Sequence, residues 1–426
     1  MMEEEMKQFA SLCLSSKSTS AEVVISNYDL LSEILSYVPV KRLICFKSVS
    51  KQWLSLISSA RFAMLHYRQC RCTSRTSAVF LESEVLLNKM DKHMVLINLN
   101  GESDQSHKNP FRYTSFSHDT FDPNKVLMLQ SCHGLLLCRT GIVVTHVPRP
   151  LFHYYVYNPT TNQLATIPIN WSNRVTIHAS VLVFDPSKSP YYKIVFCIHS
   201  PHMCPHSRRF VIYYSQTKTW KTSALGSFIP PVYLAMFNFA YFKGSIYWIT
   251  TSKVDKLVLS YNVDEDTLTT LPRPPEKVSS FIRRSFYFGE SAGHLHIAEV
   301  FACAASSLDV YQLNPDHTGW FLKFKVDLYQ LSKDLPQMRS NMYTYVDEYA
   351  FSILSLVRSR EDFDEDSVLV LEVPGKVIVY NLVDQSWKEV HNFRRADNPR
   401  HWRWEINSAI DYNESLACVN TASFWV

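Results

Sequence analysis

Five segments of the chain share one short pattern, in which a tyrosine at the end of an apolar run precedes a polar turn. A large apolar residue follows each tyrosine six to nine positions later. The pairs are Tyr157 with Leu164, Tyr214 with Trp220, Tyr261 with Leu268, Tyr311 with Trp320, and Tyr380 with Trp387. Successive tyrosines are separated by 57, 47, 50 and 69 residues. A period near 50 residues that contains a hairpin is typical of kelch-like β-propellers, in which each repeat forms one small sheet.

Strand-like runs rich in Val, Ile, Tyr and Phe surround these repeats, and Pro, Asn, Asp and Gly turns separate them. The predicted strands are Val126–Leu129, Gly134–Cys138, Tyr154–Tyr157, Val181–Phe184, Lys193–Ile198, Phe210–Tyr214, Ser245–Ile249, Leu257–Tyr261, His294–Val300 and Val377–Tyr380. No long amphipathic helix follows residue 77, which favours an all-β body. Residues 77–100, with strands at Ser408–Asp411 and Leu416–Val419, are expected to close the ring and give roughly six blades.

A helical periodicity precedes the β body. The apolar residues of the first run share a face about 140° wide; they are Leu30, Leu31, Ile34, Leu35 and Val38. We expect Ser26 to cap this helix with Asp29 as its reciprocal partner, and Pro39 to end it. A second run predicts a second helix, with its apolar face formed by Leu43, Phe46, Val49, Trp53, Leu56 and Ile57.

Two short helices cannot enclose their own apolar residues, because a segment under about 40 residues rarely folds without help. Their apolar faces must therefore be buried against the rest of this chain or against a partner protein. A third short helix is expected around residues 62–67, within a basic connection to the β body. The fold class is accordingly mainly β with a small N-terminal α domain of three helices.

The two helical runs, from Asp29 to Lys41 and from Phe46 to Trp53, resemble an F-box in the form common in plants. In that family the motif binds a Skp-type adaptor, which tethers it to a cullin ubiquitin ligase. The chain departs from the family at Ser26-Asn27, where Leu-Pro usually precedes the first helix. The resemblance implies an adaptor interface drawn from Leu30, Leu31, Ile34, Leu35, Val38, Pro39, Leu43, Phe46, Val49 and Trp53. Some of these must instead hold the helices together, and Trp53 is the first choice among them.

The β body also resembles a known region, the F-box-associated interaction region of plant F-box proteins. The segments that carry this similarity are Ser131–Leu137, Asn158–Thr161, Phe184–Pro186, Gly244–Trp248 and Gly289–Leu295. The resemblance implies a body that recruits a protein for ubiquitination, and it identifies no substrate-binding residues. The expected domains are a flexible tail at 1–21, the F-box at 22–67 and the propeller at 77–426.

Composition excludes several other classes of protein. With 46% hydrophobic residues the chain can build a sizeable core, and its net charge of +4 is too mild for a nucleic-acid-binding footprint. The N-terminus lacks the basic region of a signal peptide, and no run of about 18 apolar residues indicates a membrane span. The ten scattered cysteines are then expected to be mostly reduced thiols, in the cytoplasm or the nucleus or both.

Two groups of residues raise the question of chemistry. The segment Gly289–Gly293 matches the Gly-x-Ser-x-Gly elbow of serine hydrolases, but that motif needs a helix after it, and the strand-like His294–Ile297 favours a hairpin turn. Five potential zinc ligands lie within ten residues, with no standard spacing: Cys197, His199, His202, Cys204 and His206. We interpret them as part of a solvated loop, and we predict no cofactor.

Two charged segments also have simple interpretations. The acidic cluster formed by Glu361, Asp362, Asp364, Glu365 and Asp366 lacks the spacing of a calcium loop and predicts an exposed connection. The run from Arg394 to Trp404 interleaves basic and aromatic residues, which suits single-stranded RNA but fits blade packing better.

The sequence therefore predicts a non-catalytic substrate receptor of a Skp–cullin–F-box ubiquitin ligase, with an unknown protein substrate on the propeller. Two alternatives stay open. One is a propeller hydrolase with Ser291 as nucleophile. The other is a propeller scaffold whose F-box does not bind the adaptor, which the missing Leu-Pro favours.

Overall fold

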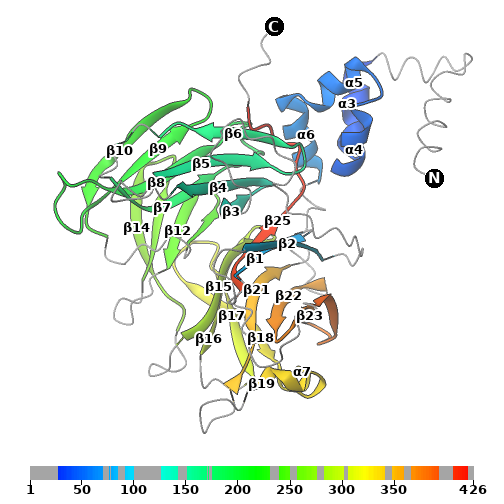
Figure 1. The fold of residues 1–426 in the computed structure, drawn as a ribbon, viewed down its shortest axis with the longest axis vertical. Helices are drawn as coiled ribbons and strands as arrows, with labels where there is room; N and C mark the ends of the chain where they lie inside the picture. Colours follow the sequence, from blue (N-terminus) through cyan, green and yellow to red (C-terminus); the bar gives the residue numbers. More distant parts are fainter. Residues whose placement is uncertain are drawn as a thin grey trace, which may run out of the picture.

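A computed structural model describes most of the chain. The described residues are 27–70, 76, 78–84, 92–99, 126–142, 151–169, 171, 175–230, 239–249, 257–275, 283–301, 306–340, 348–358, 366–392 and 406–420. A group of helices lies beside a larger body of β-sheets (Figure 1). The predicted flexible tail at 1–21 lies outside the described residues.

The N-terminal region contains four described helices, which are α3 (Tyr28–Ser36), α4 (Val40–Phe46), α5 (Lys51–Ile57) and α6 (Ala60–Cys70). The predicted second helix is therefore two helices, because the chain turns after Phe46 and starts again at Lys51. Ser50 caps α5 by accepting a hydrogen bond from the Trp53 N–H at 3.2 Å. The short helix expected around 62–67 is confirmed as part of α6.

The start of α3 also differs from the prediction, because Asn27 is the N-cap rather than Ser26. The Asn27 side-chain oxygen accepts hydrogen bonds from the N–H groups of Asp29 and Leu30, at 3.1 and 3.2 Å. An Asn cap stabilises a helix by about 1 kcal/mol relative to alanine. The first helix therefore begins with a side-chain cap where the family usually has Leu-Pro.

Five four-stranded antiparallel sheets follow, each in chain order. Blade one is β3 (Val126–Cys132), β4 (Leu135–Ile142), β5 (Leu151–Asn158) and β6 (Gln163–Ile167). Blade two is β7 (Thr176–Val183), β8 (Lys193–His199), β9 (Arg208–Tyr214) and β10 (Thr219–Phe228). Blade three is β11 (Phe239–Phe242), β12 (Ser245–Ile249), β13 (Leu257–Asn262) and β14 (Thr267–Pro272). Blade four is β15 (Arg283–Ser291), β16 (His294–Phe301), β17 (Ser307–Leu313) and β18 (Trp320–Asp327).

Blade five is β21 (Ser352–Val357), β22 (Val368–Val373), β23 (Lys376–Asn381) and β24 (Trp387–Asn392). Between blades four and five lie helix α7 (Tyr329–Asp334), the 3₁₀ turn η2 (Pro336–Met338) and a small hairpin of β19 (Arg339–Ser340) and β20 (Glu348–Tyr349). All ten strands predicted from the sequence overlap strands of these five blades.

The sixth blade joins the two ends of the chain, in the order β2 (Lys92–Asn98), β1 (Ala78–Glu84) and β25 (Ile406–Tyr412). The innermost strands β3, β7, β11, β15, β21 and β25 neighbour one another around a closed ring. The fold is therefore a six-bladed β-propeller, and the predicted closing strand at 408–411 is confirmed. The strand predicted at Leu416–Val419 is wrong, because this segment leaves the sheet after β25 and packs elsewhere.

The repeated tyrosines have one structural role, since each lies on the third strand of its blade and its apolar partner on the fourth. Tyr157 faces Leu164 across the hairpin, and the same register joins the pairs in blades three and five. Trp220 and Trp320 instead face Tyr213 and Leu313, close to the predicted tyrosines. The repeat pattern therefore located the outer hairpin of every blade from one to five.

The tryptophans of the repeat also connect neighbouring blades. The Trp220 indole N–H donates to the Pro168 carbonyl at the end of blade one, at 2.9 Å. Trp320 makes the same bond to Pro272 of blade three, at 2.9 Å. Trp387 donates to the Asp334 carboxylate on α7, at 3.2 Å. Each of these aromatic residues therefore ties its blade to the preceding part of the ring.

Candidate functional site

Four of the ten residues predicted at the adaptor interface form the core of the helical region. Leu31, Leu35, Leu43 and Trp53 are all at most 5% exposed, and they pack with Leu56, Ile57 and Phe62. The Trp53 ring meets the half-buried Phe46 edge to face, at 5.6 Å between centroids. As the sequence suggested, Trp53 holds the helices together, and it is not free to meet a partner.

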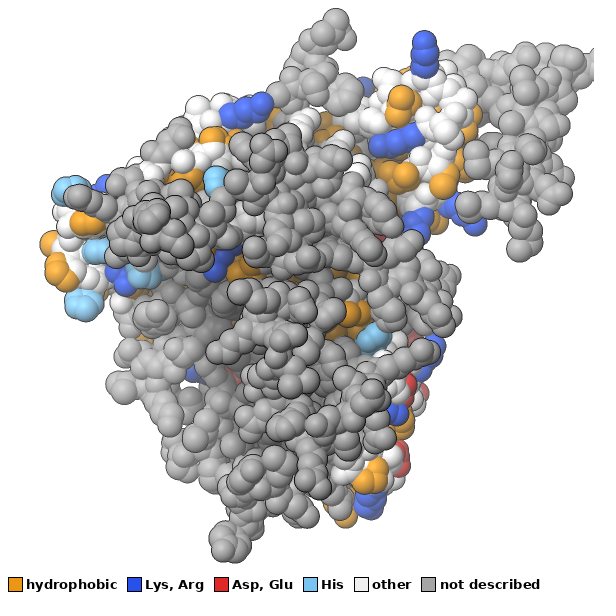
Figure 2. All heavy atoms as spheres, viewed as in Figure 1, with side chains coloured by type: hydrophobic (Ala, Val, Ile, Leu, Met, Phe, Trp, Pro, Cys, Tyr) orange, Lys and Arg blue, Asp and Glu red, His pale blue; other side chains and the backbone are white. Residues whose placement is uncertain are grey.

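The other predicted interface residues lie toward the outside. Leu30, Ile34 and Val49 are 42%, 53% and 46% exposed, Pro39 is exposed, and Val38 is half-buried. Sequence analysis missed three further exposed apolar residues of this region, which are Tyr28, Tyr37 and Leu54. Among the described residues twelve large apolar side chains are exposed, and half of them lie in this small region. Figure 2 shows hydrophobic side chains on the outer side of these helices, at the upper right.

Helix α3 therefore presents two apolar stripes. Leu31 and Leu35 point into the helical core, while Leu30, Ile34 and Tyr37 lie outward at spacings of four and three residues. Tyr37 follows the last helical residue, but it lies three positions after Ile34 and so continues this outward row. A stripe of this kind on a helix left open to water is typical of a surface that another protein covers. We call Leu30, Ile34 and Tyr37, with Pro39, the outer stripe.

The helical region packs against the propeller through the last described residues, 413–420, which we call the C-terminal strap. Leu416 of the strap is 5% exposed and belongs to the same apolar cluster as Leu43. The Lys41 ammonium pairs with the Glu414 carboxylate at 2.9 Å. The Cys418 thiol lies 3.5 Å from the Ser58 carbonyl oxygen. The strap thus completes the core of the helices.

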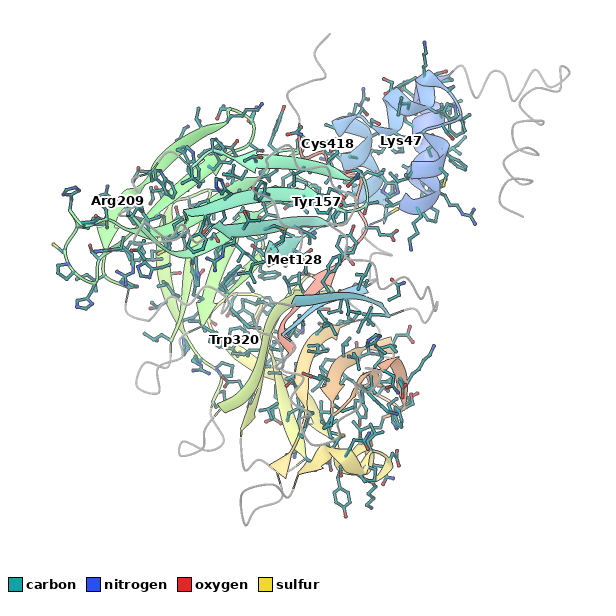
Figure 3. All side chains as sticks on the ribbon, viewed as in Figure 1. Lys47, Met128, Tyr157, Arg209, Trp320 and Cys418 are labelled. Carbon is teal, nitrogen blue, oxygen red and sulfur yellow. The ribbon has the colours of Figure 1, made fainter. Side chains whose placement is uncertain are left out.

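The junction partly removes two titratable groups from water. Figure 3 labels Lys47 and Cys418, which lie where α4 meets the strap. Burial lowers the pKa of Lys47 and raises the pKa of Cys418. Both shifts have the direction that desolvation imposes on an ammonium and on a thiol.

The strap also makes hydrogen bonds to blade one. The fully buried Asn158 donates from its amide nitrogen to the Ser415 and Ala417 carbonyls, at 3.0 and 2.8 Å. The Val419 N–H donates to the side-chain oxygen of Gln163 at 3.0 Å. Asn158, which follows the repeated tyrosine of blade one, therefore anchors the strap to this sheet.

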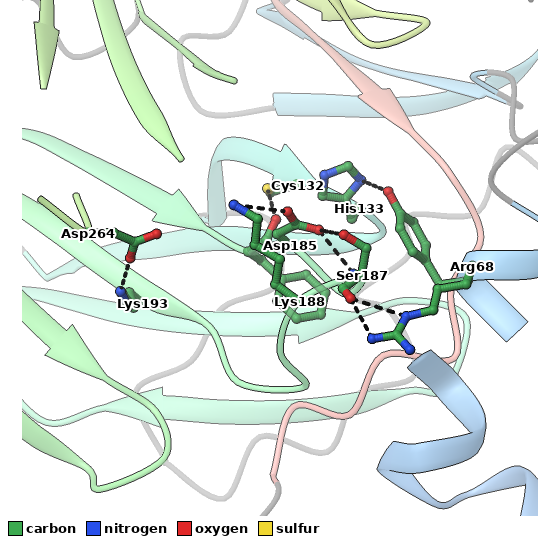
Figure 4. Close-up of polar contacts among 10 residues, drawn as sticks. Arg68, Cys132, His133, Asp185, Ser187, Lys188, Lys193 and Asp264 are labelled. Atoms are coloured by element: carbon green, nitrogen blue, oxygen red, sulfur yellow. Dashed lines mark hydrogen bonds and ion pairs between the residues drawn. The ribbon is translucent and has the colours of Figure 1, made fainter. Parts of the chain in front are cut away.

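Helix α6 makes a second, direct contact with the propeller (Figure 4). The Arg68 guanidinium donates twice to the Ser187 carbonyl, at 2.8 and 3.2 Å. The Tyr67 hydroxyl lies 3.0 Å from Nδ1 of His133. Asp185 fixes the Ser187 turn by accepting hydrogen bonds from its N–H and its hydroxyl. Two separate contacts thus hold the helices against blades one and two.

The candidates for chemistry lie in structural positions. Ser291 ends β15, and a hairpin turn leads straight into β16, so the predicted turn is confirmed and no helix follows the serine. Its buried hydroxyl accepts a hydrogen bond from the Arg358 N–H at 2.8 Å. Cys197 is buried within β8, and burial raises the pKa of its thiol to about 12. The described residues contain no cluster of three His, Cys, Asp or Glu side chains that could hold a metal ion.

Two charged segments from the sequence analysis cannot be placed. The acidic cluster, apart from Asp366, and the run from Arg394 to Trp404 lie outside the described residues. No described helix has the length and hydropathy needed to cross a membrane.

Comparison with known proteins agrees with this division of the chain. Residues 27–65 match the F-box domain family, and residues 83–287 match the F-box associated beta propeller domain family. The chain is thus an F-box protein, with its F-box domain in the helical region. More narrowly, it belongs to the F-box proteins that carry an F-box-associated β-propeller.

Three similar proteins are from Arabidopsis thaliana. "F-box protein At5g07610" is 28% identical over 94% of this chain and 94% of its own length. "Putative F-box/kelch-repeat protein At3g22730" is 23% identical over 70% of this chain and 76% of its own length. "F-box/kelch-repeat protein At3g23880" is 26% identical over 58% of this chain and 65% of its own length.

Proposed function

We propose that this protein is the substrate receptor of a Skp–cullin–F-box ubiquitin ligase, working inside the cell, in cytoplasm or nucleus. The F-box binds a Skp-type adaptor, which links the chain to a cullin. The propeller binds a protein substrate. The receptor has no chemistry of its own, and it acts by raising the effective concentration of the substrate near the ubiquitin-charged enzyme.

The observation that carries this proposal is the outer stripe of α3. Each exposed Leu or Ile that becomes fully buried contributes roughly 1.5–3 kcal/mol, so a few such residues support a stable interface. The strap and Arg68 of α6 contact the propeller, and Leu30, Ile34 and Tyr37 of the outer stripe stay exposed in this arrangement. Leu31, Leu35, Leu43 and Trp53 support this surface from beneath.

The structure also weakens the scaffold alternative. That alternative depended on the missing Leu-Pro before the first helix, and the Asn27 cap supplies a start for α3 without it. The hydrolase alternative has no support either, because Ser291 is buried in a hairpin.

The test is affinity capture of the tagged full-length chain from plant cell extract, beside a Leu30→Asp/Ile34→Asp variant. Both changes place a carboxylate on an exposed position, so the F-box core is kept. We expect the wild type to retain a Skp-type adaptor and a cullin, and the variant to lose at least nine-tenths of both. Equal recovery of both ligase components by the variant would contradict the proposed interface.

A further inference from the structure

Blade two carries a larger net positive charge than the whole chain. Residues 176–228 contain six Lys and Arg and one acidic residue, Asp185, which gives a net charge of +5. The whole chain has a net charge of +4, so the remainder is slightly acidic. The same blade contains four of the sixteen histidines. The net charge of the chain is therefore small although one of its sheets is strongly basic.

Two arginines and four histidines of this blade gather at one end of its strands, where β7 begins, β8 ends, β9 begins and β10 ends. We call this group the histidine–arginine corner; it consists of His178, His199, His202, His206, Arg208 and Arg209. Histidine and basic side chains lie together at the left edge of Figure 2, and Figure 3 labels Arg209 there. His202 and His206 are exposed on the loop between β8 and β9.

The corner is organised by hydrogen bonds that leave its charge uncompensated. The Arg208 guanidinium donates to the Ser207 carbonyl at 2.8 Å, and the Arg209 guanidinium donates to the Ser227 hydroxyl at 2.9 Å. A ring nitrogen of His199 lies 3.0 Å from the same Ser207 carbonyl. Across the described residues, no carboxylate lies within ion-pair distance of either guanidinium.

Burial and the charges of the corner act together on a neighbouring histidine. Burial, followed by the charges of Arg208 and His199, lowers the pKa of His178 to about 4. A second positive charge beside these arginines is therefore disfavoured, whereas a negative charge is favoured.

The contact between the F-box and the propeller does not cover the histidine–arginine corner. Helix α6 contacts blade two at Ser187, in the turn between β7 and β8. That turn lies at the opposite end of the strands from the loop between β8 and β9. A partner on the corner would therefore not compete with the F-box contact.

We propose that the histidine–arginine corner is a docking site for an acidic, extended segment of a protein substrate. This assignment rests on the proposed receptor function, since it names the kind of substrate that the propeller binds. Charge complementarity selects an acidic partner, and guanidinium groups bind carboxylates in paired hydrogen bonds. A nucleic acid fits less well, because single strands stack on exposed Phe, Tyr and Trp rings, and no Phe, Tyr or Trp of β7–β10 is exposed.

The test is fluorescence anisotropy with the purified full-length chain and three labelled probes. The probes are a twelve-residue peptide of Glu, Asp and Ser, its uncharged counterpart with Gln and Asn, and a twelve-nucleotide single-stranded RNA. We expect binding of the acidic peptide, weakened by added salt because surface charges are screened. We expect the neutral peptide not to bind. If the acidic peptide fails to bind, or the RNA binds more tightly than it, the proposal is wrong.

Two variants with the same change of charge locate the site within blade two. Arg208→Gln/Arg209→Gln removes the corner, and Lys218→Gln/Lys221→Gln removes two charges at the other end of the sheet. We expect the dissociation constant to rise about tenfold or more for the arginine variant, and less than twofold for the lysine variant. Equal weakening by both would show general electrostatic attraction and overturn the assignment.

A third variant protects the test against misfolding of the arginine variant. His202→Glu/His206→Glu changes two exposed loop residues and leaves the strands intact. This variant should also weaken binding of the acidic peptide, because it adds negative charge beside the arginines. Unchanged affinity in this variant would also contradict the proposal. The assay contains no adaptor, so its outcome is independent of the capture experiment.

Discussion

Replacing Asp411 by asparagine is expected to stabilise the protein, and to do so more strongly at pH 8 than at pH 5. Asp411 lies on β25, the strand that closes the ring, and its Oδ1 atom is buried without a hydrogen-bond partner among the described residues. Burial, with a further contribution from the Glu290 carboxylate, raises the pKa of Asp411 to about 7.

The direction of the pH effect follows from this raised pKa. The folded protein holds the proton more tightly than the unfolded chain, so wild-type stability falls as the pH rises from about 4 to about 7. This rise in the pKa of Asp411, to about 7, corresponds to about 4 kcal/mol. Because the residue as a whole is half-buried, solvent screening lowers our expectation to about 2 kcal/mol at pH 8, and to less than half of that at pH 5.

The measurement is the thermal unfolding midpoint of Asp411→Asn and wild type at both pH values. Any cost of burying the amide itself is the same at pH 5 and pH 8, so only the difference between them tests the argument. Asp384→Asn is the control, since the side chain and N–H of Ser386 lower the pKa of Asp384. It should show no gain as the pH rises. A gain for Asp411→Asn that is equal at both pH values would contradict the account.

Replacing Gly134 by alanine is expected to displace the C-terminal strap. Gly134 lies in the turn between β3 and β4 with φ of +85°, a conformation that costs other residues about 1–2 kcal/mol. A Cβ atom there would overlap the Ser415 Cβ and lie 2.7 Å from the Asn413 carbonyl oxygen. The strap must therefore move away from blade one, which loosens Leu416 from the core of the F-box.

A matched control separates this displacement from backbone strain. Gly375 has φ of +81°, and no heavy atom of the described residues lies within 4 Å of the Cβ that alanine would add there. We expect Gly134→Ala to lower the free energy of unfolding by about 2 kcal/mol more than Gly375→Ala, as overpacking of a close contact does. Hydrogen exchange at residues 413–420 should also speed up in Gly134→Ala alone. Equal effects of the two variants would show that the strap is not held at this turn.

Much of the propeller could be predicted, because its signal is local. The Tyr-to-Trp pattern records the hairpin of the two outer strands, whose residues face each other over a few positions of sequence. The helical region was predicted less completely. One amphipathic face was expected for Leu30, Leu31, Ile34 and Leu35, and the fold divides it into an inner and an outer stripe. Helical periodicity shows which residues of a helix are apolar, but it does not show which of them face the core of the domain and which face outward.

The strap could not be predicted, because its partners lie far away in sequence. Leu416–Val419 is an apolar run of strand-like composition, and only the packing of Leu416 against α3–α5 shows its role. Asn158 binds the strap across more than 250 residues of chain. The basic blade was missed for a different reason. The net charge of the chain is a sum, in which the slightly acidic rest of the chain offsets part of the positive charge of blade two.

The central claim, that the outer stripe of the F-box binds a Skp-type adaptor, is tested most directly by calorimetric titration of the purified adaptor into Ile34→Asp. Val383→Asp is the control, because Val383 on the propeller is 54% exposed and Ile34 is 53% exposed. We expect wild type and Val383→Asp to bind alike, and Ile34→Asp to bind at least tenfold more weakly. Unchanged affinity of Ile34→Asp, in a protein with an unchanged unfolding midpoint, would contradict this account.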